Sequence, residues 1–130
     1  MTKKKILIIE DNEQNLYLTT FLLERENYEV VQARDGQQGL DSASSENPDL
    51  ILLDIQLPVM DGYEVARRLK QSEETKAIPI VAVTSYAMAG DRETILATGC
   101  EGYIEKPIDP DSFVEQLRGF LPQSERGGME

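Results

Sequence analysis

The amino-acid sequence predicts an α/β fold, in which five mostly parallel strands form one sheet with helices on both faces. Two observations lead to this prediction. Five short runs of aliphatic and β-branched residues alternate with five segments whose apolar residues recur at helical spacing. Turn-forming residues, chiefly Asn, Gly and Pro, fall between these segments. Such an alternation implies right-handed crossovers between parallel strands, and 130 residues suffice for one domain of this kind.

The first half of the chain contains three expected strands, residues 5–10, 28–33 and 49–54. The first and third are almost wholly aliphatic, as is typical of strands buried on both faces of a parallel sheet. A helix is expected in each gap between them, and Asn27 and Asn47 separate each helix from the next strand. The apolar residues that give the two helices their spacing are Leu18, Phe21 and Leu22, and then Leu40 and Ala43.

The second half contains a fourth strand at residues 78–84 and a weaker fifth at residues 101–106, with helices before, between and after them. The residues with helical spacing are Val65, Ala66 and Leu69, then Ile95 and Leu96, then Phe113, Leu117, Phe120 and Leu121. The last helix is expected to end near Leu121. We therefore expect one domain at residues 1–121 and a flexible tail at residues 122–130.

Composition excludes several classes of function. The chain has 24 acidic and 13 basic residues, so its net charge of -11 disfavours nucleic acid and anionic membranes as direct partners and favours a basic partner or a metal cation. It has no histidine, the commonest general base and metal ligand. Cys100, the single cysteine, cannot form an internal disulfide and is expected to be a packed small residue. No apolar run approaches a membrane span or a signal-peptide core, so a cytoplasmic location is expected.

Polar residues end the expected strands. Glu10 and Asp11 follow the first strand, and Asp54 ends the third. Two charges about 4 Å apart repel by about 4 kcal/mol at an effective dielectric of about 20, so such a pair must be compensated or used. If the strand order is 2-1-3-4-5, the three carboxylates converge at one edge of the sheet and suit a hard cation such as Mg²⁺. Thr84 and Lys106, at the ends of the fourth and fifth strands, would then face a tetrahedral anion.

Four motifs, EDN after the first strand, LLDIQLPVMDG at the third, VTS at the fourth and KP after the fifth, resemble the receiver domain of two-component response regulators. The resemblance covers residues 4–121 and is specific, because the motifs agree in order. It implies a flavodoxin-like, CheY-like (βα)5 fold with strand order 2-1-3-4-5. The stretches VAVTSYAMAGD and GCEGYIEKPI are most similar to stand-alone regulators of the DivK kind and to receivers of hybrid kinases.

The resemblance implies a role for each site residue. Asp54 would be the phosphoacceptor. Asp11, Asp54 and the backbone carbonyl of Gln56 would hold Mg²⁺, and Glu10 would act mostly through a metal-bound water. Lys106 would contact the phosphoryl group and would gain a partner only after phosphorylation. The phosphoryl group would come from a histidine kinase or a histidine phosphotransfer protein, because this chain has no histidine of its own.

The resemblance also implies a switch. Thr84 would move toward the phosphoryl group and let Tyr103, at the switch-aromatic position, turn inward. The fourth helix, fifth strand and fifth helix would then bind a downstream protein. A cis bond before Pro107 is expected from the family, although only about 5 to 6% of such bonds are cis. Gln56 and Tyr86 would flank the phosphoryl group. The Gln56 amide could place a water for hydrolysis, whereas the Tyr86 ring could shield the phosphoryl group from water. We expect the shielding to outweigh the water placement, so the phosphoryl group would be long-lived.

These features predict a single-domain response regulator of a two-component system or phosphorelay. It would be a signalling protein rather than a turnover enzyme, one that catalyses phosphoryl transfer onto its own Asp54 and slow self-dephosphorylation. No effector follows Leu121 in the chain as given, so docking or relay is the expected output; an excised receiver of a longer protein is the alternative origin.

Three other interpretations remain at this point. A haloacid-dehalogenase-like phosphohydrolase needs a second Asp two residues after its nucleophile, where this chain has Gln56. A receiver-fold docking module would keep the fold without phosphorylation. In a flavodoxin, the acidic EDN loop would repel the cofactor phosphate. Individual residues also have ordinary explanations: Asp11 or Asn12 could cap the first helix, Lys106 could be a solvated charge, and Tyr103 a partly buried aromatic.

Overall fold

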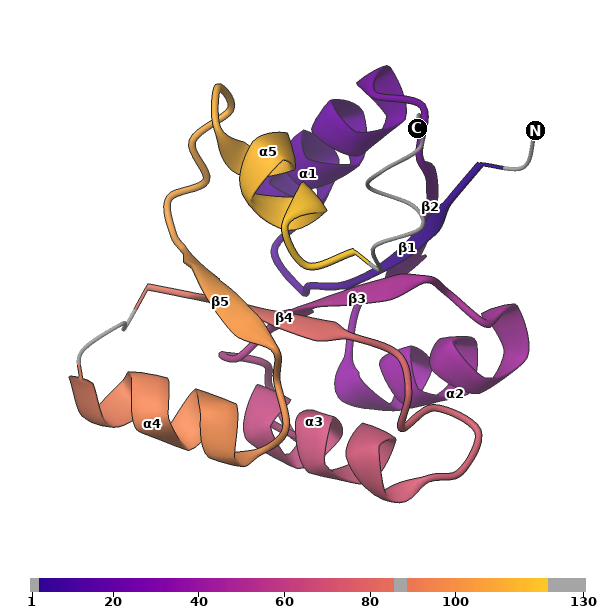
Figure 1. Ribbon diagram of the computed structural model, residues 1–130, viewed down its shortest axis with the longest axis vertical. Coiled ribbons are helices and arrows are strands. Elements are labelled where there is room, and N and C mark those ends of the chain that lie inside the picture. Colours follow the sequence, from indigo (N-terminus) through magenta and orange to yellow (C-terminus); the bar gives the residue numbers. More distant parts are fainter. Residues whose placement is uncertain (1–2, 86–88, 122–130) are drawn as a thin grey trace.

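In the computed structural model, which describes residues 3–85 and 89–121, five strands and five helices alternate along the chain (Figure 1). The strands are β1 (Lys5–Ile9), β2 (Glu29–Ala33), β3 (Leu50–Asp54), β4 (Ile80–Thr84) and β5 (Gly102–Glu105). The helices are α1 (Glu13–Arg25), α2 (Gly36–Glu46), α3 (Gly62–Gln71), α4 (Ala89–Ala97) and α5 (Phe113–Arg118). None of the helices in this described part is long and apolar enough to cross a membrane.

The strands form one parallel sheet in the order β2-β1-β3-β4-β5. This confirms the predicted fold class and strand order. Strand order reverses between β1 and β3, and their register pairs Ile9 with Leu53. The residues that follow Ile9 therefore lie beside Asp54 at the carboxyl edge of the sheet, where ligands bind in open α/β sheets.

Two hydrophobic layers enclose the sheet, because successive side chains of a strand point to opposite faces. Ile6 and Ile8 of β1 pack in one layer, together with apolar residues of α1 and α5. Leu7 and Ile9 pack in the other, with residues of α2, α3 and α4. Figure 1 shows the same division, with α1 and α5 on one side of the sheet and the other three helices on the opposite side. The sheet is thus covered on both faces, as the aliphatic strands predicted.

Most strand boundaries agree with the sequence prediction within one residue, but two element boundaries differ by more. β4 begins at Ile80 rather than at residue 78, since Pro79 has no N–H to donate to a neighbouring strand. α5 ends at Arg118 rather than near Leu121. Beyond it the backbone tightens, because the N–H groups of residues 119–121 donate to carbonyls three residues earlier. The expected tail at residues 122–130 lies outside the described residues.

Candidate functional site

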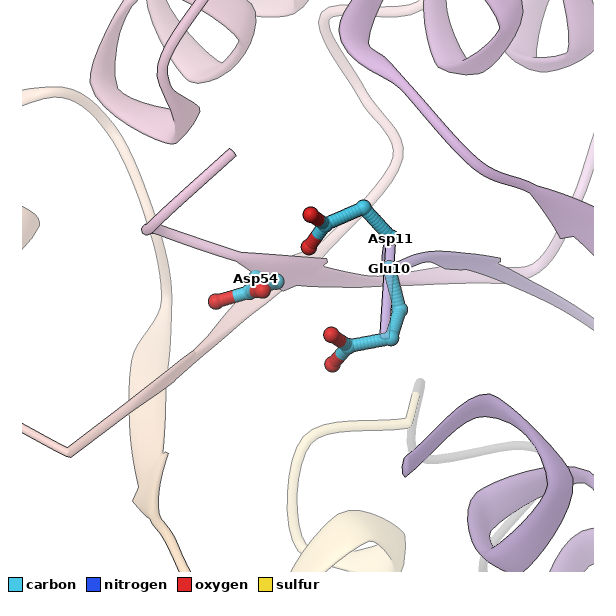
Figure 2. Close-up of side chains that lie close together, drawn as sticks. All are labelled: Glu10, Asp11 and Asp54. Atoms are coloured by element: carbon cyan, nitrogen blue, oxygen red, sulfur yellow. The ribbon is translucent and has the colours of Figure 1, made fainter. Parts of the chain in front are cut away.

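Three carboxylates meet at the carboxyl ends of β1 and β3. Glu10 and Asp11 directly follow β1, and Asp54 is the last residue of β3 (Figure 2). One oxygen from each side chain lies within 4.8 Å of the other two. Glu10 and Asp54 are 5% and 3% exposed, whereas Asp11 is open to solvent. Carboxylate oxygens in this number suit Mg²⁺, so the residues fit the cation that the sequence predicted.

Lys106 reaches into the site and contacts both buried acids. Its Nζ lies 3.3 Å from Asp54 Oδ1 and 3.5 Å from Glu10 Oε1, and the side chain is only 16% exposed. It is therefore not a solvated surface charge. The expectation that Lys106 gains a partner only on phosphorylation is wrong, because two anions compensate the buried ammonium already.

Backbone N–H groups hold the two buried carboxylates in place. The N–H of Gln56 donates to Asp54 Oδ1 at 3.0 Å, and that of Asn12 donates to Glu10 Oε2 at 3.1 Å. Both donors lie in the loops that directly follow the strands. Each acid is thus oriented by the backbone two residues beyond it.

Burial and the neighbouring Asp54 change the titration of Glu10. Burial, followed by the nearby negative charge of Asp54, raises the pKa of the Glu10 carboxyl from 4.5 to about 7. Lys106 and the Asn12 N–H oppose this rise, because they stabilise the charged form. The site therefore holds more negative charge than its own cation balances, and an added divalent cation would offset the excess.

Asn12, and not Asp11, caps the first helix. Asn12 Oδ1 accepts the N–H of Asn15 at 2.9 Å, which is the usual N-cap bond. This settles the alternative that the sequence left open. The Asp11 carboxylate has no capping role and can act as a ligand.

The far side of the site is built from the ends of β4 and β5. Thr84 ends β4, is 1% exposed and accepts the N–H of Lys106 through its carbonyl oxygen at 2.9 Å. The Lys106–Pro107 peptide bond is cis. Gln56, in the loop after β3, reaches toward the end of β4. Its Oε1 accepts a hydrogen bond from the Ser85 hydroxyl at 2.9 Å. Tyr86, the other predicted flanking residue, lies outside the described residues.

Tyr103 is half-buried on β5 against the layer that includes α4. The guanidinium of Arg92, on α4, lies 5.7 Å from the centre of its ring. Tyr103 does not touch the carboxylates, so the structure places it beside the site rather than in it. Sequence reasoning missed Arg92, and no local pattern marks it, since the contact joins two elements. It also missed Ser85, which the VTS motif could have indicated.

Gly62, the first residue of α3, allows close packing behind Asp54. A Cβ atom at this position would lie 2.5 Å from Ile55 Cα and 2.7 Å from the Asp54 carbonyl oxygen. Both are backbone atoms that cannot move aside independently. The motif LLDIQLPVMDG ends in this glycine, and the structural need for it comes from a contact with the strand end.

The sequence pattern of the response regulator receiver domain matches residues 6–118. The chain belongs to this family. It is 48% identical over 118 residues to the polar-differentiation response regulator DivK of Brucella ovis, covering 91% of this chain and 96% of that protein. Membership in the receiver family excludes the haloacid-dehalogenase and flavodoxin interpretations, and it makes this chain a signalling protein of the response-regulator kind.

Solved receiver structures are similar over nearly the whole domain. The receiver domain of the Pseudomonas aeruginosa sensor histidine kinase PA1611, which has a magnesium ion coordinated in its active-site cleft, superposes with a TM-score of 0.84 at 34% identity. That match covers 92% of this chain and 98% of the other. Chemotaxis protein CheY4 of Vibrio cholerae superposes with a TM-score of 0.88 at 27% identity, covering 92% and 100%. These neighbours are consistent with the observed sheet order.

Proposed function

We propose that this receiver domain accepts a phosphoryl group on Asp54 from the phosphohistidine of a histidine kinase or a histidine phosphotransfer protein. The observation that carries the proposal is the environment of Asp54. Its carboxylate is nearly buried at the end of β3, is fixed by a backbone N–H, and is contacted by Lys106 at 3.3 Å. A helix cap or a surface acid would not need this environment.

Asp11, Asp54 and the backbone carbonyl of Gln56 would hold Mg²⁺, with Glu10 assisting through water. The convergence of three carboxylates within 4.8 Å supports this assignment. When bound, the cation supplies positive charge that stabilises the phosphoryl oxygens during transfer. Asp11 is open to solvent, so this ligand would be accessible to an incoming cation.

In the transfer step, a carboxylate oxygen of Asp54 attacks phosphorus and forms a P–O bond. The P–N bond of the phosphohistidine breaks, and its electron pair returns to the imidazole nitrogen of the donor, which then takes a proton from solvent. Lys106, whose Nζ lies 3.3 Å from Asp54 Oδ1, would neutralise charge on the transferred oxygens. The chain therefore supplies a nucleophile, a cation and a fixed orientation, the elements on which phosphoryl transfer chiefly depends.

Phosphorylation would bias a switch through the far side of the site. It adds negative charge and acceptor oxygens at Asp54, toward which the buried Thr84 hydroxyl would turn. The space left behind would let Tyr103 move inward. The surface formed by α4, β5 and α5 would then change its affinity for a downstream protein. The contact between Arg92 on α4 and Tyr103 on β5 links two of these elements, which supports the proposal that they respond together.

Labelling with a small phosphodonor tests the proposal without knowledge of the kinase. With acetyl phosphate and Mg²⁺, the protein should gain one phosphoryl group that is labile to both acid and base, as an acyl phosphate is. Asp54→Asn should abolish incorporation, while Asp61→Asn, a change of the same kind at the exposed cap of α3, should not. Incorporation by Asp54→Asn at the parent's rate would refute the assignment and favour a docking module that works without phosphorylation.

A further inference from the structure

A groove runs along β5 and the start of α5, on the side of the molecule where the sheet ends. β5 pairs with β4 on one side, and within residues 3–85 and 89–121 no strand pairs with its outer edge. The groove has a volume of about 430 Å³. Its walls are formed by Tyr103, Glu105, Pro107, Asp109, Ser112 and Gln116. Figure 1 shows β5 in this edge position, between α4 and α5.

The two acids of the groove have no cation of their own. In the described parts of the chain, neither Glu105 nor Asp109 forms an ion pair. From the described residues, the Asp109 carboxylate accepts two hydrogen bonds with neutral donors, the N–H of Asp111 and the hydroxyl of Ser112. The two basic residues between the start of β5 and the end of α5 are already engaged. Lys106 contacts the acids of the phosphorylation site, and Arg118 contacts Glu26 and Glu115.

The stretch of chain around the groove is acidic as well. Residues 91–116, which include β5 and much of the flanking helices, contain seven acidic and two basic residues. Two of these acids, Glu101 and Glu115, pair with Lys70 and Arg118 outside the stretch. One of the two basic residues, Lys106, is turned into the phosphorylation site. The other, Arg92, lies over the ring of Tyr103 and does not line the groove.

We propose that this groove binds an arginine-bearing basic segment of a partner protein, whose guanidinium groups pair with Glu105 and Asp109. The inference rests on the proposed binding surface of α4, β5 and α5 and assigns it a partner chemistry. Arginine fits better than lysine, because its planar guanidinium pairs with carboxylates through two hydrogen bonds. The partner's segment lies along the open edge of β5.

The test uses a fluorescein-labelled nonapeptide with two arginines, and the same peptide with citrulline, the neutral analogue, in their place. Binding is measured by fluorescence anisotropy at low ionic strength, and backbone amide NMR shifts locate the contact. The arginine peptide should bind more tightly than the citrulline peptide and shift amides of residues 102–116. The double variant Glu105→Gln, Asp109→Asn should raise the dissociation constant about tenfold, because each exposed charge pair contributes about threefold.

A matched control separates local pairing from the overall negative charge. Glu29→Gln with Glu74→Gln removes the same charge from exposed positions on β2, at the opposite edge of the sheet, and on the loop after α3. It should leave the dissociation constant within about twofold. Equal weakening by both double variants, equal binding of the citrulline peptide, or amide shifts confined to other surfaces would each overturn the proposal.

The peptide assay is also separate from the phosphorylation assay. Unphosphorylated parent and Asp54→Asn proteins should show the same dependence of peptide binding on Glu105 and Asp109, because neither groove acid contacts Asp54. A failure to phosphorylate Asp54 would therefore leave the groove result intact. Loss of charge dependence in the groove would likewise leave the labelling result intact.

Discussion

Stability of the metal-free protein should fall as pH rises from about 5 to about 8, and Glu10→Gln should remove most of that fall. Glu10 is buried beside Asp54, which raises its pKa in the folded protein from 4.5 to about 7. Between these two values the folded state keeps a proton that the unfolded state has lost. The free energy of unfolding therefore decreases with rising pH across this interval, which is the opposite of the usual effect of a salt-bridged carboxylate.

The size of the effect follows from the same two values. A difference of one pKa unit corresponds to about 1.4 kcal/mol, so a pKa that moves from 4.5 to about 7 contributes about 3 kcal/mol in full. Glutamine has nearly the same shape and can still accept the N–H of Asn12, but it carries no charge. Relative to the parent, Glu10→Gln should thus gain about 3 kcal/mol between about pH 4.5 and about pH 8.

The assay is urea unfolding followed by circular dichroism, in a metal-chelating buffer, at several pH values for the parent, Glu10→Gln and Glu74→Gln. Glu74 is exposed, so the last variant controls for loss of one negative charge. Added Mg²⁺ should flatten the parent's profile, because a cation stabilises the charged carboxylate. Parallel pH profiles for the parent and Glu10→Gln would refute the reasoning and show that Glu10 is not crowded by Asp54.

Three further outcomes are expected. Asp11→Ala should weaken Mg²⁺ binding, measured by calorimetry, by at least about tenfold, yet leave the metal-free protein as stable as the parent, because it removes a repelling charge. Gly62→Ala should lower the free energy of unfolding in urea by about 1 to 3 kcal/mol, because its Cβ would lie 2.5 Å from a backbone atom. Gly119→Ala is the control: its Cβ would lie 3.4 Å from the nearest atom, so the free energy of unfolding should change by less than about 1 kcal/mol. Arg92→Gln should release the ring of Tyr103, so that its NMR signals shift and thermal stability falls by about 0.5 to 1 kcal/mol; unchanged ring signals would contradict the stacking.

Runs of aliphatic and β-branched residues predicted every strand within about two residues. The signal is strongest for β1, β3 and β4, because burial on both faces requires apolar residues along nearly the whole strand. The end of α5 was predicted less well. Phe120 and Leu121 continue the helical spacing, but the backbone after Arg118 makes tighter turns, which apolar spacing does not encode. Conversely, the parallel register of β1 and β3 brought Glu10 and Asp54 together as expected.

The sequence by itself determined the fold class, the strand order through its family motifs, and the strand ends that carry acidic, hydroxyl and ammonium groups. It could do so because periodicity and chain order are local properties. Only the tertiary structure decided that Lys106 lies between Glu10 and Asp54, that the Glu10 pKa rises, and that Arg92 covers Tyr103. These features depend on distances of a few ångströms between side chains from different elements and on the water they exclude. Spacing along the chain fixes neither quantity, because both arise only when the helices and strands pack together.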